Sequence, residues 1–490
     1  MPDRRLLNRR RLLTLGGITA GGILGGAVLL PKGQTPAPGG TGHNGHGVEP
    51  VAGTRSIRPE TQFSQRMPVP RQLTPTRATG VDLYRIPIQP GQAEFRTGHP
   101  TAVRTYAGQF VGPTIRAKTG RPVRVTFTNE LDVASNVHLH GGHVPQSSDG
   151  HPMDMIAPGQ SRTYDYPNTQ QGATLWYHDH AHHLEAENVY FGLHGFYIIE
   201  DDAEKNLGLP GGPYDVPIML RDAELDANGA LVYPSHPPNR TTILANGVVT
   251  PNFPVAARKY RFRLLNAANE RTFSLSLGGA ALVQIGSDGG LLPAPVVRSE
   301  IVLGSAERAD VVIDFSGHPI GSHLVLYDVS GPVLRFDVTR AAPDPSVVPA
   351  VLRPLPALPP ATVERDIAMK FDLSGAEPVA LVNGRPYDPN RVDFRVKRGT
   401  TEIWHVRNDD VEFGIPHTFH LHLEQFRVLD RNGAPPSLDD AGRKDTIFIA
   451  PGETVRVQVT FTDHLGKYVY HCHYLEHSAL GMMAQMEVVA

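Results

Sequence analysis

Four histidine pairs of the form His-x-His constrain this chain more than any other feature of its sequence. The pairs are His138/His140, His178/His180, His420/His422 and His471/His473. In a β-strand, residues i and i+2 point to the same face, so each pair presents two imidazoles to one place. One such pair is weak evidence, because histidines are common on solvated strands. Four pairs placed alike in two stretches of the chain indicate a metal site built on strands.

The two stretches that carry the pairs follow one template. The matching positions, each nine residues from the next, are Gly120, Asn129 and His138 in the first stretch and Gly399, Asn408 and His417 in the second. An Ala-Pro-Gly tripeptide also ends 19 residues before His178 and 19 residues before His471. Residues 260–315 have a similar texture but no histidine pair. We therefore predict two copies of one domain, with a third copy between them that carries no ligands.

The apolar residues alternate with polar ones, which is the period of a β-strand. We predict strands at 121–130, 260–265, 309–315, 402–406 and 455–461. The 49 glycines and 44 prolines favour many turns, and no long segment has a helical period. A chain of 490 residues is also too long for one hydrophobic core. The prediction is an all-β protein of three sandwich domains, at residues 61–205, 206–350 and 351–490.

The N-terminal segment 1–32 is typical of an export signal. Its twin arginines, Arg9 and Arg10, precede a glycine-rich apolar run, which is the pattern of the twin-arginine route. A membrane anchor is the alternative, but the glycines weaken it, so we expect cleavage and no stable membrane span afterwards. Residues 33–60, rich in Pro and Gly, predict a flexible linker. The mature protein is then periplasmic, extracellular or attached to the cell envelope. The net charge of −3 becomes −8 without the six basic residues and one acid of residues 1–32, so the chain lacks the basic patch of a nucleic-acid-binding protein.

Cys472 is the only cysteine and stands between His471 and His473. It cannot form an intramolecular disulfide, and the strand alternation turns its thiolate away from the two flanking imidazoles. A Cys thiolate with two histidines and a weak axial Met is the ligand set of a blue-copper site. His417, His477 and Met482 can complete that set. Eight further imidazoles also suit copper, which ranks highest among divalent first-row metals for nitrogen ligands, whereas zinc is satisfied by four.

Four motifs resemble those of the multicopper oxidases, in particular the bacterial three-domain laccase-like enzymes that include spore-coat laccases and copper-efflux oxidases. The motifs are HLHG at 138–141, HDH at 178–180, HTFHLH at 417–422 and HCHYLEHSALGM at 471–482. The similarity runs over most of residues 60–490. It implies three consecutive cupredoxin-like Greek-key β-sandwich domains, with a trinuclear copper cluster between the first and third.

The resemblance implies four copper ions. The type 1 copper is expected on Cys472, His417, His477 and Met482, and the type 2 copper on His138 and His420. The two type 3 coppers are expected on His140, His178, His180, His422, His471 and His473. The resemblance also makes His477 the entry point for electrons and Cys472 the link to the cluster.

Two further positions concern protons. Asp149 stands nine residues after His140, where bacterial relatives have an acidic residue that assists proton delivery, so we expect the same role. Relatives commonly carry a Glu directly after the histidine that matches His477, and this chain has Ser478. That departure removes no copper ligand, but it puts the proton path in question.

The function expected from the resemblance is a laccase-type oxidation of phenols, aromatic amines or related reductants, coupled to four-electron reduction of O2 to water. The first alternative is a metallo-oxidase that acts on Cu(I) in copper tolerance. Nine methionines and the lack of a Met-rich run weigh against it. The second alternative is a copper-free envelope scaffold, and the complete ligand set weighs against that.

Other histidines, acids and methionines fall outside the motifs. We expect the histidines at the surface, namely His143, His151, His182, His183, His194 and His405. We expect Glu185 and Glu187 to be solvated, and Met153 and Met155 to pack in the core.

Overall fold

The computed structural model describes residues 62–490, so the predicted signal (1–32) and linker (33–60) lie outside the described range. Strands dominate the described part, as predicted. The five strands expected from alternation fall on β5, β14, β19, β25 and β29. Within residues 62–490 the strands form six sheets, which pack as three successive pairs. Each pair is a β-sandwich with its own hydrophobic core.

The first pair of sheets is built from β1 to β9. One sheet holds, in order, β1 (Thr76–Ala78), β2 (Val81–Arg96), β5 (Val123–Asn129) and β7 (Ser161–Tyr166), with β3 (His99–Tyr106) also paired to β2. The other holds β4 (Gly112–Lys118), β9 (His194–Glu200), β8 (Ala173–His178) and β6 (His138–His140). Alternation explains the core: Val123, Val125 and Phe127 of β5 are buried, and the residues between them are not.

The middle pair is built from β10 to β21. Its larger sheet holds β12 (Val248–Val249), β11 (Thr242–Ala245), β10 (Asp215–Ala223), β14 (Lys259–Asn266), β19 (Arg308–Asp314), β16 (Leu282–Ser287) and β17 (Gly290–Arg298). Its smaller sheet holds β13 (Asn252–Ala257), β21 (Gly331–Ala341), β20 (His323–Asp328), β15 (Phe273–Ser276) and β18 (Glu300–Leu303).

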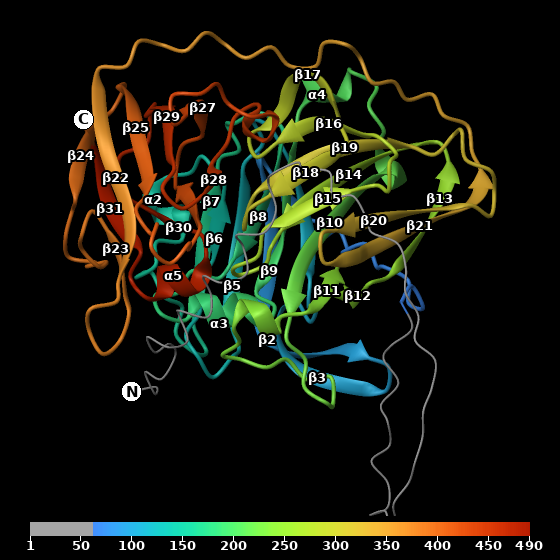
Figure 1. The fold of residues 1–490 in the computed structure, drawn as a ribbon, viewed down its shortest axis with the longest axis horizontal. Helices are drawn as coiled ribbons and strands as arrows, with labels where there is room; N and C mark the ends of the chain where they lie inside the picture. The colour runs from blue at the N-terminus through green and yellow to red at the C-terminus, as the bar shows by residue number, and fades with distance from the viewer. Residues whose placement is uncertain (1–61) are drawn as a thin grey trace, which may run out of the picture.

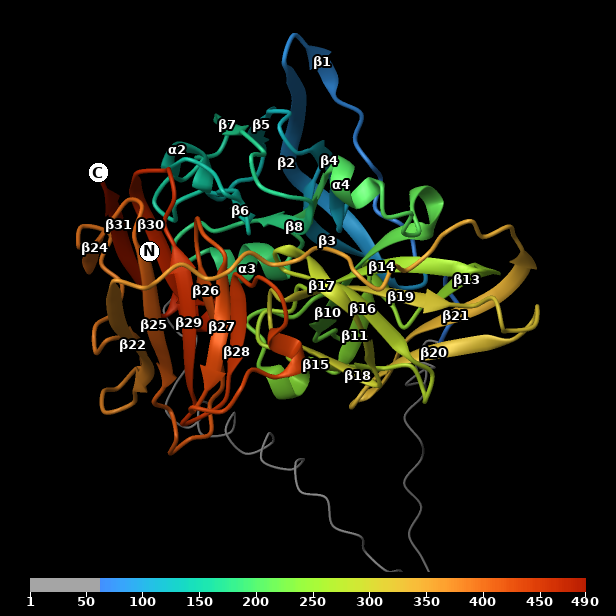
Figure 2. The ribbon, with the colours of Figure 1, turned by 90° about the horizontal axis from the view of Figure 1, so that it is seen from above.

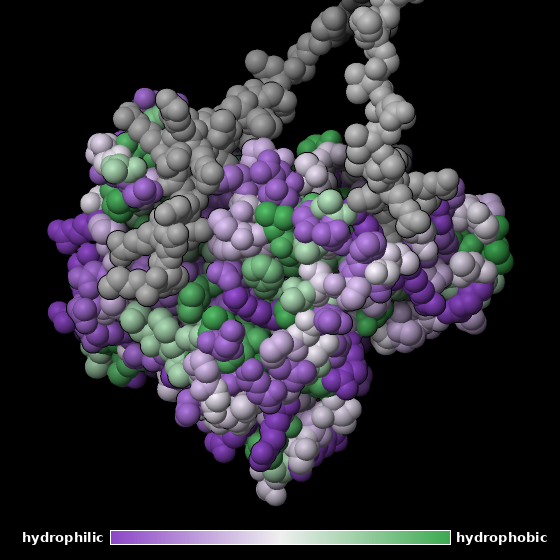
Figure 3. All heavy atoms as spheres, turned by 90° about the horizontal axis from the view of Figure 1, so that it is seen from below, coloured by the Kyte–Doolittle hydropathy of each residue, from purple (hydrophilic) through white to green (hydrophobic). Residues whose placement is uncertain are grey.

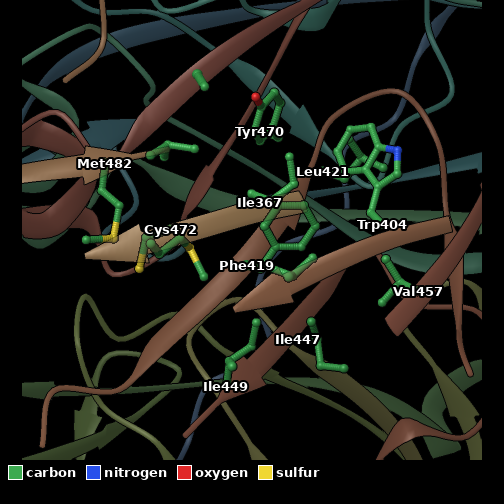
Figure 4. Packing of buried hydrophobic residues seen from close by; sticks show 14 of the residues in the cluster. Ile367, Trp404, Phe419, Leu421, Ile447, Ile449, Val457, Tyr470, Cys472 and Met482 are labelled. Atoms are coloured by element: carbon green, nitrogen blue, oxygen red, sulfur yellow. The ribbon is translucent and has the colours of Figure 1, made fainter. Parts of the chain in front are cut away.

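The last pair is built from β22 to β31. One sheet holds β23 (Val379–Val382), β22 (Val363–Asp372), β25 (Thr401–Asn408), β29 (Thr454–Thr460) and β27 (Phe426–Arg431). The other holds β24 (Phe394–Lys397), β31 (Met483–Val489), β30 (Gly466–Cys472), β26 (His417–Leu421) and β28 (Thr446–Ile449). In this core Phe419 lies between Trp404 on one side and Cys472 and Met482 on the other (Figure 4).

Helices are few and short. They are α2 (Gln146–Asp149), α3 (Glu185–Tyr190), α4 (Asp202–Lys205) and α5 (Leu475–Ala479), with the 3-10 turns η1 (Gly212–Tyr214), η2 (Pro237–Asn239) and η3 (Leu438–Asp440). None of the helices in the described part is long and apolar enough to cross a bilayer.

The three sandwiches meet around the first one. In Figure 1 strands β6 to β9 lie between the last pair of sheets, in red and orange, and the middle pair, in yellow. The stretch 342–362, which has no strand, crosses from the middle to the last pair over the outside of the molecule (Figure 2). Exposed large apolar residues such as Val297 and Val329 are scattered, and the visible part of the face in Figure 3 shows small apolar groups among polar ones.

Candidate metal centres

The histidine pairs sit on two strand pairs with the same pairing pattern. Strand β6 pairs antiparallel with β8, so that His138 lies opposite His178. Strand β26 pairs antiparallel with β30, so that His420 lies opposite His471. Both strand pairs are hydrogen-bonded into sheets, and His180, His422 and His473 follow within two residues of the strand ends.

This register corrects the alignment of the two repeats. The nine-residue spacing matched His138 with His417, but the strand pairing makes His138 equivalent to His420. The reason is that the connection from Asn408 to His420 is three residues longer than the one from Asn129 to His138.

All eight histidines of the four pairs converge and are at most 1% exposed. Three groups have ring nitrogens within 4.8 Å of one another: His138/His140/His420, His140/His178/His473 and His180/His422/His471. The groups combine residues of the first and last sandwiches. Burial, followed by neighbouring imidazoles, holds the pKa of most of these rings well below the usual value, so they are neutral, the form that binds metals.

The hydrogen bonds of the rings show that a cation fits between them. His138 Nδ1 donates to the Asp149 carbonyl at 2.6 Å, and His420 Nδ1 donates to the Asp445 carbonyl at 2.8 Å. In a neutral ring this leaves both Nε2 atoms without a proton. These two Nε2 atoms face each other at 3.4 Å. Two lone pairs that face each other in a buried place repel, and a shared metal ion removes the repulsion.

The same arrangement recurs on the other side of the cluster. His471 Nδ1 donates to the Cys472 carbonyl at 2.9 Å, which leaves its Nε2 bare. That Nε2 lies 3.1 Å from His180 Nε2 and 3.3 Å from His422 Nε2. His422 Nδ1 in turn faces Asp149 Oδ2 at 2.8 Å. The donor set therefore fits more than one metal ion.

Cys472 belongs to a second, separate group on the opposite face of β30. Its Sγ lies 3.7 Å from His417 Nδ1 and 3.6 Å from His477 Nδ1, and these two nitrogens are 3.1 Å apart. Met482 is wholly buried beside them, and its carbonyl accepts the Cys472 N–H at 3.0 Å. Burial raises the pKa of the Cys472 thiol to about 12, so a thiolate here requires a cation. Cys, two His and Met are the donors of a blue-copper site.

Asp149 is wholly buried at the end of α2 and contacts two of the clustered histidines. Besides its bond to His422, its Oδ1 lies 3.6 Å from His138 Nδ1. Burial, followed by the charge of Asp154, raises the pKa of this carboxyl well above its usual value. Gly150 makes the close approach feasible: its φ is +77°, and a Cβ there would meet the Val137 carbonyl at 2.1 Å.

Three carboxylates that orient histidines escaped the sequence reasoning. Asp410 Oδ2 accepts from His417 Nε2 at 2.8 Å, Asp445 Oδ1 lies 3.0 Å from His140 Nε2, and Glu270 Oε1 lies 3.4 Å from His477 Nε2. Arg308 of the middle sandwich holds Asp445 with two hydrogen bonds of 2.6 Å. The sequence offered one weak signal, because Asp410 follows Asn408 by two residues, whereas the first repeat has Leu131 at that place.

Several expectations for residues outside the motifs were wrong. His151 and His194 are buried rather than at the surface; His194 packs edge-on to Phe110, 5.5 Å between ring centroids. Glu185 is wholly buried, whereas Met153 and Met155 are 43% and 39% exposed. The reason is that both methionines lie on the surface loop between α2 and β7, and neither packs into a hydrophobic core.

Comparisons with known proteins agree with this geometry. Family models described as multicopper oxidase match residues 87–204, 214–340 and 359–490. A laccase of Bacillus stratosphericus is 37% identical, over 80% of this chain and 91% of the relative. A laccase of Bacillus subtilis (strain 168) is 36% identical, over 87% of this chain and 98% of the relative. The crystal structure of a laccase from Pediococcus acidilactici matches with a TM-score of 0.82 at 34% identity, over 89% of this chain and 96% of that one.

Proposed function

This chain belongs to the multicopper oxidase family, and on that premise we propose that it acts as a laccase-like oxidase. Its three sandwiches are cupredoxin-like, and it is an oxidoreductase that uses oxygen. The reaction is the one-electron oxidation of phenols, aromatic amines or related reductants, coupled to four-electron reduction of O2 to water. One observation carries the proposal: His471, Cys472 and His473 are adjacent residues at the end of β30 and belong to two different buried donor sets.

The proposed ligands are those expected from the sequence. Cys472, His417, His477 and Met482 would hold the type 1 copper, and His138 and His420 the type 2 copper. The type 3 pair would be held by His140, His178, His180, His422, His471 and His473. Bound copper supplies one-electron redox chemistry, which no amino-acid side chain of this site provides by itself. Support for four ions comes from the number of buried imidazoles and from their facing Nε2 atoms.

The chain itself contributes orientation and exclusion of water. Asp410, Asp445 and backbone carbonyls hold the non-binding nitrogen of several rings, which fixes the ring plane and the tautomer. Burial keeps water away from both donor sets. The shortest covalent link between the sets is the backbone around Cys472, which joins the thiolate to both flanking histidines. Electrons from a reductant that docks at the edge of His477 would therefore have a path of covalent bonds, through Cys472, to the cluster.

We also propose Asp149 as a residue that assists proton delivery. Reduction of O2 to water consumes protons, and this carboxyl is wholly buried against His422 and His138. Its Oδ1 has no hydrogen-bond partner within residues 62–490. Replacement by Asn should therefore lower turnover while the copper content stays the same.

We also propose the domain boundaries and the location. The ranges 61–205, 206–350 and 351–490 are supported by the grouping of strands into three pairs of sheets. Export by the twin-arginine route, followed by signal cleavage, is supported by Arg9 and Arg10. Relocation of the protein to the cytoplasm on replacement of both arginines by Lys would test it.

A cuprous oxidase in copper tolerance is the second candidate, and one observation favours it. Met153 and Met155 are exposed, and thioethers are ligands that Cu(I) prefers. The backbone N–H of Met153 lies 3.3 Å from His151 Nδ1, so an imidazole is nearby. The chain still lacks a Met-rich run. A copper-free scaffold remains the third reading.

Oxygen uptake separates these candidates. The copper-loaded protein is assayed with a panel of phenols, with aromatic amines and with Cu(I). We expect uptake with phenols or amines, with one O2 consumed for every four electrons removed and no release of hydrogen peroxide. A clear preference for Cu(I) would support the cuprous oxidase. A folded, copper-loaded protein that consumes no O2 with any reductant would contradict both oxidases.

A further inference from the structure

Glu185, on the first turn of α3, is a buried acid that neither donor set uses. Its side chain is 0% exposed, and its Oε1 accepts a hydrogen bond from Ser478 Oγ at 3.1 Å. Its Oε2 has no hydrogen-bond partner in the described part of the chain. Burial raises its pKa to about 8, and the two charged groups that add to the rise, Asp179 and Glu476, are acids. Glu185 therefore holds a proton at neutral pH and can release it.

Glu185 and Ser478 occupy equivalent positions in the two repeats. Each stands seven residues after the histidine that begins a pair, Glu185 after His178 and Ser478 after His471. The helices that carry them, α3 and α5, pack against each other through Ala186, Val189 and Leu475. The two positions thus meet between the first and last sandwiches. A carboxyl from either side would reach the same place.

Both residues of the contact follow a cluster histidine by five residues, Glu185 after His180 and Ser478 after His473. Helix α3 follows His180 closely, because the Glu185 N–H donates to the Ala181 carbonyl at 2.9 Å. On the other side, the Ser478 N–H donates to the Tyr474 carbonyl at 3.0 Å, one residue beyond His473. The acid and the hydroxyl therefore sit between the two chain segments that leave the cluster.

Tyr387 is a second buried protonatable group near Glu185. The carboxyl of Glu185 is, after burial, the largest cause of the raised pKa of Tyr387, whose hydroxyl has no partner in the described range. The Tyr387 ring is 5.0 Å from the ring of His182. His182 stacks at 3.7 Å on His183, which is exposed.

We propose that Glu185 supplies protons to the oxygen-reducing site through Ser478, and that Tyr387 lies on the path by which it is reprotonated from solvent. This inference rests on the proposed oxidase function. One O2 takes up four electrons, from four one-electron oxidations of the reductant, and four protons, and gives two waters. Each proton that leaves Glu185 is replaced from solvent, so the residue ends each cycle unchanged. In this chain the carboxyl stands in the first repeat, at Glu185, and the equivalent position of the last repeat holds Ser478.

The test measures two half-reactions of the variant Glu185→Gln separately, namely reduction of the protein by a phenol and its reoxidation by O2. We expect the copper content and the blue absorption to stay unchanged, and anaerobic bleaching by a phenol to proceed within about twofold of wild type. Reoxidation by O2 should slow by about 100-fold, the size of a lost proton donor. Wild-type reoxidation should fall as pH rises through about 8, because Glu185 loses its proton there, and the variant should be slow at every pH.

Infrared difference spectra of the resting protein give a readout without turnover. Wild type should lose the stretch of a protonated carboxyl between pH values below and above about 8, and Glu185→Gln should lack that change. Glu187→Gln, on the same helix but 39% exposed and paired with Arg104, is the matched control and should behave as wild type. Glu185→Gln combined with Ser478→Glu returns a carboxyl to the same contact and should restore most of the reoxidation rate.

The outcomes distinguish this inference from the proposed function. Wild-type reoxidation in Glu185→Gln with full copper would overturn the role of Glu185 and leave the oxidase intact. If wild type itself is not reoxidised by O2, the proposed function fails. If Glu185→Gln does not fold, Tyr387→Phe, which removes one hydroxyl, should slow reoxidation alone, and an unchanged rate would overturn the inference.

Discussion

The strand pair β6–β8 of the first sandwich and the strand pair β26–β30 of the last one have the same pattern but different chemistry on their inner faces. Both direct histidine pairs to the shared cluster. Where the last sandwich has His417 and Cys472, the equivalent positions of the first hold Ser135 and Asp179. Ser135 Oγ donates to Asp179 Oδ2 at 2.6 Å, so that place is filled by a hydrogen bond.

The difference shows how one backbone design yields two kinds of site. Alternate strand residues point to opposite faces, so the outer face can keep its imidazoles while the inner face changes. In the last sandwich the inner face carries the soft thiolate donor that suits copper. In the first it carries a closed polar cluster, in which Asp179 also accepts the backbone N–H groups of Asn136 and Ala181 at 2.9 Å.

The largest expected effect comes from removing the residue that makes the two strand pairs differ. Cys472→Ser should abolish the blue absorption and lower turnover by more than ~1000-fold, because even an outer partner of a metal ligand is worth ~10–100-fold. The copper content should fall by about one ion per chain, since the eight-histidine cluster is intact. Absorption spectroscopy with metal analysis checks this. A blue band that survives would mean that the sulfur is not a ligand.

Loss of the ion pair between Arg308 of the middle sandwich and Asp445 of the last one should have the next largest effect. Arg308→Met leaves the buried Asp445 without its cation, which should lower the free energy of unfolding by about 3–5 kcal/mol. Arg395→Met, at an ion pair that is 68% exposed on the arginine side, is the control and should change it by less than ~1 kcal/mol. Denaturant titration measures both. Equal effects would show that the middle sandwich does not support the cluster.

Asp410 is a partner that only the last strand pair has. Asp410→Ala removes the acceptor of His417 Nε2 and frees that ring to turn. Affinity for the copper at Cys472 should fall by ~10–100-fold, and the blue band should shift. Competition with a copper chelator, followed at the blue band, gives the affinity. An unchanged affinity would show that packing alone orients His417.

The equivalent place in the first sandwich should affect stability and leave the thiolate site unchanged. Asp179→Asn keeps the shape but loses part of the acceptor capacity towards Ser135 and two backbone N–H groups. We expect a loss of about 1–3 kcal/mol, with the blue absorption unchanged. Loss of the blue band in this variant would contradict the separation of the two inner faces.

The contact of His143 in the first sandwich with Glu424 and Asp463 in the last one lies outside the cluster, and its loss should give the smallest effect. Burial lowers the pKa of His143, but bonds to Glu424 and Asp463 outweigh it and raise the pKa to about 9. Because the folded value lies above the unfolded one of about 6.5, the stabilisation is complete below pH about 6.5 and is lost as pH rises through about 9. His143→Gln should lower the free energy of unfolding by under ~1 kcal/mol near neutral pH, because Asp463 is 59% exposed and solvent weakens the ion pair. Above pH about 9 the substitution should have no such effect, because His143 is then uncharged. A constant effect across pH would contradict the ion pair.

Sequence periodicity and spacing predicted the strands and placed the motif histidines together. They succeed because alternation, as in Val123, Val125 and Phe127, is a local property that the fold keeps. Asp410, Asp445 and Arg308 were missed because their roles depend on contacts between distant segments: Arg308 meets Asp445 over 137 residues. Glu185 was read as solvated because its polar neighbours hid that α3 packs on α5. The repeat alignment failed at His417 because spacing cannot detect a longer loop.

One chain holds a thiolate site and a separate eight-histidine cluster. A titration of the copper-free protein with copper, followed by absorption spectroscopy, distinguishes the two sites. We expect saturation near four copper ions per chain, with a blue band that corresponds to about one of them. Saturation without a blue band, or at one ion per chain, would contradict this arrangement.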